Sequence, residues 1–80
     1  MIISPYTFID GLKDKSYEEL IKERDKLIRA IRYFEKHKKE LAEQEEHMCP
    51  SPSTHYYWNL HYLSELIKLI IEKYEELDEE

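Results

Sequence analysis

The sequence has few residues that turn or break a chain: of its 80 residues, one is glycine and three are proline. All four lie outside two long stretches with helical periodicity, whereas a small β-fold needs several turn residues. Cys49 is the only cysteine, so the chain cannot build an internal disulfide framework, and a lone thiol suits a reducing compartment. These scarcities argue against a sheet fold and against a disulfide-stabilised fold.

Long apolar runs are also missing. The most apolar run, residues 66–71, is interrupted by Lys68 and is far shorter than the roughly 20 residues that span a bilayer. Residues 1–5 contain no basic segment leading into an apolar core, the pattern of a secretory signal peptide. We therefore expect a cytoplasmic protein with no membrane partner.

Charged and apolar side chains are both abundant, at 38% and 41% of the residues. This balance is typical of long amphipathic helices and not of a disordered chain. The net charge of −6 argues against a general nucleic-acid binder. The charge is uneven, because residues 13–39 hold ten Lys/Arg against six Asp/Glu, whereas residues 40–80 hold two against eleven.

The first 15 residues form an apolar, aromatic lead-in. Ser4-Pro5 is a typical helix start and Gly11 a typical helix stop. This pattern predicts a short helical turn or an ordered arm over residues 1–15. Because so many apolar side chains are unfavourable in water, we expect the arm to dock on the rest of the chain or on a second subunit.

A first long helix is predicted over residues 16–46. Ser16 and Glu19 have the spacing of a capping box. Large apolar residues then recur every seven positions. They are Leu20, Leu27, Phe34 and Leu41.

A loop over residues 47–51 separates this helix from a second one over residues 52–78. Pro50 ends the first helix, and Ser51-Pro52 starts the second. The second helix carries an apolar stripe at alternating spacings of three and four. Its members are Tyr56, Leu60, Leu63, Ile67, Ile70, Tyr74 and Leu77, and Tyr62, Leu66, Leu69 and Ile71 flank it.

The predicted fold is an all-α single domain over residues 1–80, an antiparallel two-helix hairpin with a short N-terminal arm. With the loop centred near residue 50, Arg29 would lie near Glu72, Lys26 near Glu75 and Lys22 near Glu79.

Two helices alone bury little surface, and the apolar arc of the second helix is broader than one partner helix can cover. We therefore expect dimerisation into a four-helix bundle, although a different helical protein could cover the same surface. The expected core and interface residues are Tyr56, Leu60, Leu63, Ile67, Ile70 and Tyr74.

The predicted hairpin tip gathers residues of the types that bind transition metals. His47, Cys49 and His55 lie there, with Glu43 and Glu46 one turn back. The alternative is a polar loop with a buried cysteine. We favour this alternative because structural zinc sites have paired Cys and His spacings, and so we expect no metal and no cofactor. A nucleophilic Cys49 would also need an oxyanion-binding loop or a pocket, which a bare hairpin does not provide, so we predict no enzymatic activity.

Basic side chains recur at roughly helical spacing on the first helix, on the side away from its apolar stripe. They are Lys22, Arg29, Arg32, Lys36 and Lys39. Such a ridge can contact phosphates. The favoured alternative is a solvated face that pairs with the acidic residues of the second helix.

One stretch resembles a group of known sequences. It runs from Cys49-Pro50-Ser51-Pro52 through Tyr57, Asn59-Leu60, Tyr62-Leu63 and Leu66-Ile67. This pattern is similar to short helical-hairpin proteins of Gram-positive anaerobic bacteria, a group with no assigned activity. The resemblance implies a bacterial cytoplasmic setting and carries no functional residue with it.

The leading functional hypothesis is a non-enzymatic module for protein–protein interaction or oligomerisation. The first alternative is a small regulator that contacts nucleic acid through the basic ridge, and the second is a metal-binding hairpin tip.

Overall fold

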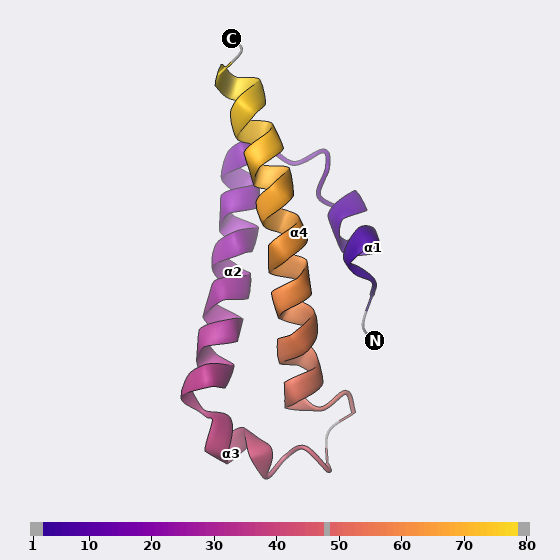
Figure 1. The fold of residues 1–80 in the computed structure, drawn as a ribbon, viewed down its shortest axis with the longest axis vertical. Helices are drawn as coiled ribbons and strands as arrows, with labels where there is room; N and C mark the ends of the chain where they lie inside the picture. Colours follow the sequence, from indigo (N-terminus) through magenta and orange to yellow (C-terminus); the bar gives the residue numbers. More distant parts are fainter. Residues whose placement is uncertain (1–2, 48, 79–80) are drawn as a thin grey trace.

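A computed structural model of the chain describes residues 3–47 and 49–78. Within them the chain is all-helical, which confirms the predicted class. Four helices follow one another: α1 (Pro5–Asp10), α2 (Tyr17–Lys36), α3 (Lys38–Ala42) and α4 (Pro52–Asp78) (Figure 1). The molecule is long and thin, with principal extents of 51 × 23 × 14 Å.

The N-terminal lead-in forms α1 and packs on α4. Ser4 caps α1 by accepting a hydrogen bond from the backbone N–H of Thr7, and Pro5 occupies the first helical position. The ring of Phe8 stacks on that of Tyr62, with centroids 4.6 Å apart. The Tyr62 hydroxyl donates a hydrogen bond to the carbonyl oxygen of Ile3. The arm therefore docks on its own chain, which is one of the two docking sites predicted for it.

The predicted first helix is shorter in the structure and is followed by a second, separate helix. It begins at the predicted capping box and ends at Lys36, because His37 has φ −110° and ψ 26°. The five-residue α3 follows, and residues 43–47 form turns. The prediction of one helix over residues 16–46 is therefore wrong. α4 begins at Pro52, four residues before the Tyr56 that stacks on Phe34, so it extends only about one turn past Phe34. A helix continued to residue 46 would have no apolar partner over its last turns.

α2 and α4 lie side by side and run in opposite directions (Figure 1). Two aromatic contacts mark how they align: Phe34 stacks on Tyr56 at 4.4 Å, and Tyr17 lies 6.3 Å from Tyr74 between ring centroids.

This alignment differs by about ten residues from the predicted one, because the early end of α2 lengthens the connection. The predicted proximity of Arg29 to Glu72 and of Lys26 to Glu75 is therefore wrong, and Glu79 lies outside the described residues. All ion pairs within residues 3–47 and 49–78 join residues at most four positions apart.

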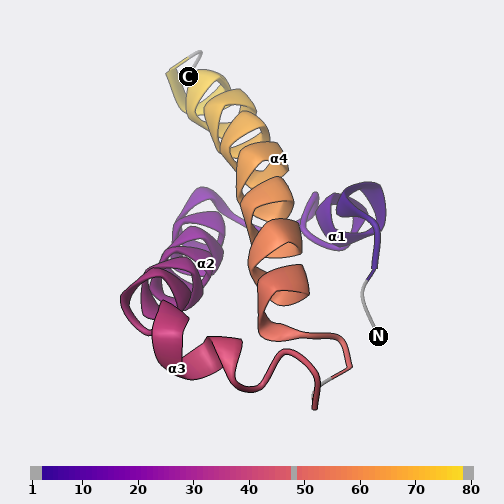
Figure 2. The ribbon, with the colours of Figure 1, turned by 60° about the horizontal axis from the view of Figure 1, so that its bottom comes forward.

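α4 lies between α1 and α2 (Figure 2), and the core forms where the three helices meet. The buried cluster consists of Leu12, Leu20, Leu66 and Leu69, with Phe8, Ile9, Leu27 and Ile70 packed against it. α1 and α2 approach α4 from the sides that carry Leu66 and Leu69. Leu60, Ile67 and Tyr74, which the sequence predicts as core residues of a dimer, are exposed in the single chain.

Candidate protein interaction face

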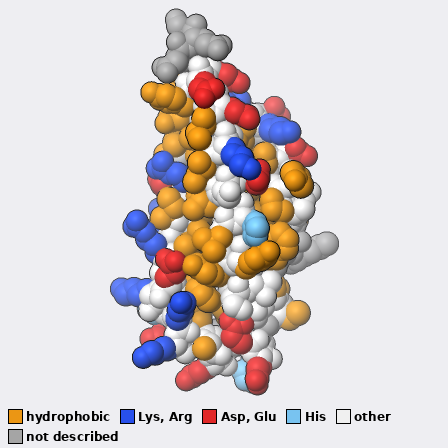
Figure 3. Space-filling view, viewed as in Figure 1, with side chains coloured by type: hydrophobic (Ala, Val, Ile, Leu, Met, Phe, Trp, Pro, Cys, Tyr) orange, Lys and Arg blue, Asp and Glu red, His pale blue; other side chains and the backbone are white. Residues whose placement is uncertain are grey.

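One side of α4 is apolar and uncovered along most of its length. Five large side chains lie there, each between 41% and 55% exposed, and we call them the α4 face. They are Tyr57, Leu60, Ile67, Ile71 and Tyr74. Their spacings of three, four or seven residues place them on one side of a helix, and Figure 3 shows hydrophobic side chains following α4 down the molecule.

The α4 face has a shallow depression near its N-terminal end. Tyr57, Leu60, His61 and Ser64 line it. The Tyr57 ring meets the rings of Trp58 and His61 edge to face, at centroid distances of 5.5 Å and 4.5 Å. These contacts hold the exposed Tyr57 ring in place, so less side-chain entropy is lost when a partner covers it.

The three consecutive aromatic residues at the start of α4 point in different directions. Tyr56 stacks on Phe34 of α2. The ring centroid of Trp58 lies 6.3 Å from that of Tyr62, whose ring stacks on Phe8 of α1. Tyr57 is 55% exposed. It is therefore the member of the triplet that is available for a contact outside the chain.

The two flanks of the α4 face differ in character. Exposed His61, Lys68 and Glu75 follow one edge, and Lys68 Nζ lies 3.1 Å from Glu65 Oε1. The other edge carries half-buried Leu63 and Ile70 and leads toward α2. The face is thus bordered by charge on one side and by apolar surface on the other.

The structure divides the predicted interface residues into two groups. Leu60, Ile67 and Tyr74 belong to the α4 face, whereas Tyr56, Leu63 and Ile70 are half-buried toward α2. Tyr57 and Ile71 complete the face but are absent from the predicted interface. Their spacing to Leu60 and Ile67 was a usable signal, because each is three or four residues from one of them.

The candidate metal ligands at the loop lie on the surface. His47, Cys49 and His55 are exposed, and within residues 3–47 and 49–78 no group of three His, Cys, Asp or Glu side chains is placed to hold a metal ion.

A different residue connects the loop to α4. Glu45 Oε1 and Oε2 accept hydrogen bonds from the backbone N–H and the hydroxyl of Ser53, at 3.0 Å and 2.9 Å. Partial desolvation raises the pKa of the Glu45 carboxyl, but hydrogen bonds from Ser53 and Ser51 outweigh it, and the pKa lies below its ordinary value. Sequence reasoning missed this contact.

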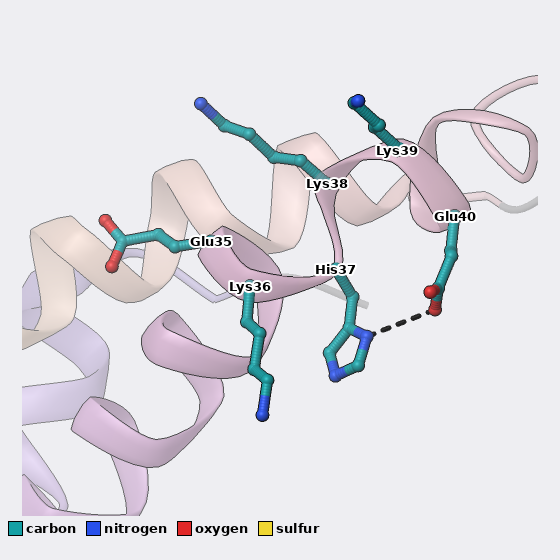
Figure 4. A pocket seen from close by; sticks show the side chains of 6 residues that line it. All are labelled: Glu35, Lys36, His37, Lys38, Lys39 and Glu40. Atoms are coloured by element: carbon teal, nitrogen blue, oxygen red, sulfur yellow. Dashed lines mark hydrogen bonds and ion pairs between the residues drawn. The ribbon is translucent and has the colours of Figure 1, made fainter.

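The basic ridge follows α2 but does not continue onto α3. Lys22, Arg29, Arg32 and Lys36 are exposed on one side of α2 and, in the described part of the chain, form no ion pair. Beyond the break at His37 the basic side chains point in a different direction. Figure 4 shows Lys38 and Lys39 pointing away from Lys36 and His37, and His37 Nδ1 lies 3.1 Å from Glu40 Oε2. Lys39 is therefore not part of the ridge.

Comparisons with protein-family models, with curated proteins and with solved structures found no match for this chain. The resemblance to short helical-hairpin proteins of Gram-positive anaerobic bacteria stays a prediction. Among the described helices, none combines the length and the apolar character needed to cross a membrane.

Proposed function

We propose that this chain is a non-enzymatic interaction module that associates with a second copy of itself through the α4 face. The observation that carries the proposal is a row of five large apolar side chains, about half exposed, along one side of one helix. Contiguous apolar patches of this kind on soluble proteins commonly mark interaction sites.

The size of the face fits a weak but specific dimer. Taking about half of the roughly 200 Å² of a large side chain for each residue, the five offer on the order of 500 Å² per copy. A pair would then bury about 1,000 Å², which is at the lower end of specific interfaces. We therefore expect a dimer that dissociates on dilution.

A second copy suits this surface because the chain has a small core of its own. Four buried side chains make up its main cluster, and small domains commonly gain stability by oligomerising. The apolar edge of the α4 face continues onto α2, where Ile21 and Ile28 follow Tyr17 by four and eleven residues. Two α2–α4 pairs would therefore close into a four-helix bundle. The single exposed thiol, Cys49, suits the reducing bacterial cytoplasm that we propose as the setting.

The test is a charge placed at the centre of the α4 face. Ile67→Asp buries an unpaired carboxylate in the proposed interface but leaves the core of the single chain untouched, because Ile67 is 43% exposed. The matched control is Tyr33→Asp, which also removes an exposed apolar side chain from a helix, at a position on α2 outside the face.

We expect native protein and Tyr33→Asp to be dimers at high concentration, and Ile67→Asp to be a helical monomer. The readouts are solution mass by light scattering and helix content by circular dichroism. A dimeric Ile67→Asp, or a native chain that stays monomeric and folded, would contradict the proposal.

A second candidate function is phosphate contact through the α2 ridge. The observation in its favour is that Lys22, Arg29, Arg32 and Lys36 are exposed and unpaired with acidic side chains in the described residues. The net charge of −6 opposes it, so we rank it second.

A further inference from the structure

The α4 face has nearly the same order of side chains in both directions. Exposed Ser64 lies on the same side of α4 between Leu60 and Ile67 and is counted with the face here. Outward from the point between Glu65 and Leu66 come Ser64 and Ile67, then two aliphatic residues, then two tyrosines. The equivalent pairs, from the ends to the centre, are Tyr57 with Tyr74, Leu60 with Ile71, and Ser64 with Ile67. A face with this symmetry can pack on an identical helix that runs the opposite way.

We infer that two copies associate α4 against α4 in antiparallel orientation, about a twofold axis that passes between the two helices, perpendicular to both, at the level between Glu65 and Leu66. The inference rests on the proposed function, because it specifies the orientation of that dimer. Spacings of three and four along the face are those of a coiled-coil seam. At the centre, Ser64 of each copy lies opposite Ile67 of the other, and the small side chain gives the larger one room.

The charged edge of the α4 face supports the antiparallel orientation. His61, Lys68 and Glu75 each lie one residue after a face residue. In the antiparallel pair this edge meets the same edge of the second copy, so its ionisable side chains lie together at a solvent-exposed rim and are not set against apolar surface. The two Lys68 side chains meet near the axis, where Glu65 of the same chain already compensates each of them at 3.1 Å.

The apolar edge supports the same orientation. Leu63 of one copy would meet Ile70 of the other, and both side chains are half-buried in the single chain. A parallel pair would instead set the charged edge of one copy against the apolar edge of the other. That arrangement desolvates three ionisable side chains per copy without partners.

Disulfide cross-linking tests the orientation. In a Cys49→Ser background, Leu60→Cys and Ile71→Cys are made as separate proteins and oxidised alone and as a mixture. In the antiparallel pair, residue 60 of one copy faces residue 71 of the other. Identical residues lie about 16 Å apart along the axis, beyond the roughly 7 Å between Cα atoms that a disulfide can span.

We expect cross-linked dimers in the mixture, each containing one chain of each variant, and none in either protein alone. Leu60→Cys that cross-links by itself as readily as the mixture would overturn the antiparallel orientation. So would absence of cross-linking in samples whose solution mass is that of a dimer, and the proposed function would survive both results. A Cys49→Ser parent that has the mass of one folded chain at every concentration would overturn both claims.

Discussion

The ring of Phe34 on α2 stacks on the ring of Tyr56 on α4, with centroids 4.4 Å apart and planes inclined by 15°. The Tyr56 hydroxyl also donates a 2.8 Å hydrogen bond to Glu35 Oε2. These two contacts join the last turns of α2 to the first turns of α4 and so fix how the two helices align. They also turn Tyr56 away from the α4 face and leave its neighbour Tyr57 exposed on it.

Replacing Tyr56 with Phe should make stability less sensitive to alkaline pH. The hydrogen bond to Glu35 raises the pKa of Tyr56 above its ordinary value. The bond is therefore fully present below about pH 10 and is lost as the pH rises through the raised pKa. We expect native protein to melt higher than Tyr56→Phe at pH 9 and the difference to shrink as the pH is raised above 10. A difference that stays constant would contradict this role for the hydroxyl.

Leu66 should carry more of the stability than Leu60, which is exposed on the same helix. Leu66 is fully buried where α1, α2 and α4 meet, so Leu66→Ala should lower the free energy of unfolding by about 2–5 kcal/mol. Leu60→Ala is the control, because Leu60 is exposed on the same helix, and it should cost less than about 1 kcal/mol in dilute, monomeric protein. Urea denaturation measures both. An equal decrease in the free energy of unfolding for the two variants would show that the core lies elsewhere.

The capping box of α2 should contribute stability that acid removes. Ser16 Oγ accepts from the Glu19 N–H at 3.3 Å, and the Ser16 N–H donates to Glu19 Oε1 at 3.2 Å. The hydrogen bond from the Ser16 backbone is the main reason that the pKa of Glu19 lies below its ordinary value. This stabilisation is present above about pH 4.5 and is lost as the pH falls through the lowered pKa.

Ser16→Ala should therefore cost about 1 kcal/mol at neutral pH. For Glu19→Gln, the denaturation midpoint should fall below the native one at pH 7, and the two midpoints should approach each other as the pH falls below 4.5. A separation between the midpoints that does not change with pH would rule out the carboxylate as the cause.

The α2 ridge gives a clear prediction for the second candidate function. If it contacts phosphates, retention on heparin or mixed DNA should weaken steeply with salt and disappear when Arg29, Arg32 and Lys36 are changed to Glu. The matched control changes Lys38 and Lys39 to Glu, because these side chains point away from Lys36 (Figure 4). Absence of binding at low salt removes this function, and equal losses in both variants would show that binding is not confined to the ridge.

The sequence predicted the helical class and the helix starts because these depend on local chemistry. It left open whether the arm docks on the chain or on a second subunit, because contacts such as that of Phe8 with Tyr62 join residues distant in sequence. Ser4, Ser16 and Ser51 each precede their helix as expected, and a cap acts within one turn. The break at His37 was not predicted, because it depends on where α4 stops supporting α2. That position depends on contacts distant in sequence, such as Phe34 with Tyr56.

Only part of the candidate site was predicted, for a similar reason. Periodicity identified α4 as apolar over a broad arc, but α4 carries apolar residues on several sides. Only the positions of α1 and α2 decide that Leu66 and Leu69 are buried and that Ile67 and Ile71 are exposed. Predicted pairing between basic residues of α2 and acidic residues of α4 failed because it relied on an alignment set by loop length.

The most direct test of the α4 face is the solution mass of the native chain, measured by light scattering after gel filtration across a hundredfold range of concentration. We expect the mass to rise from that of one 9.9 kDa chain toward twice that value, and Ile67→Asp to keep the single-chain mass throughout. A native chain that stays fully helical and has the mass of one chain at every concentration would contradict self-association through this face.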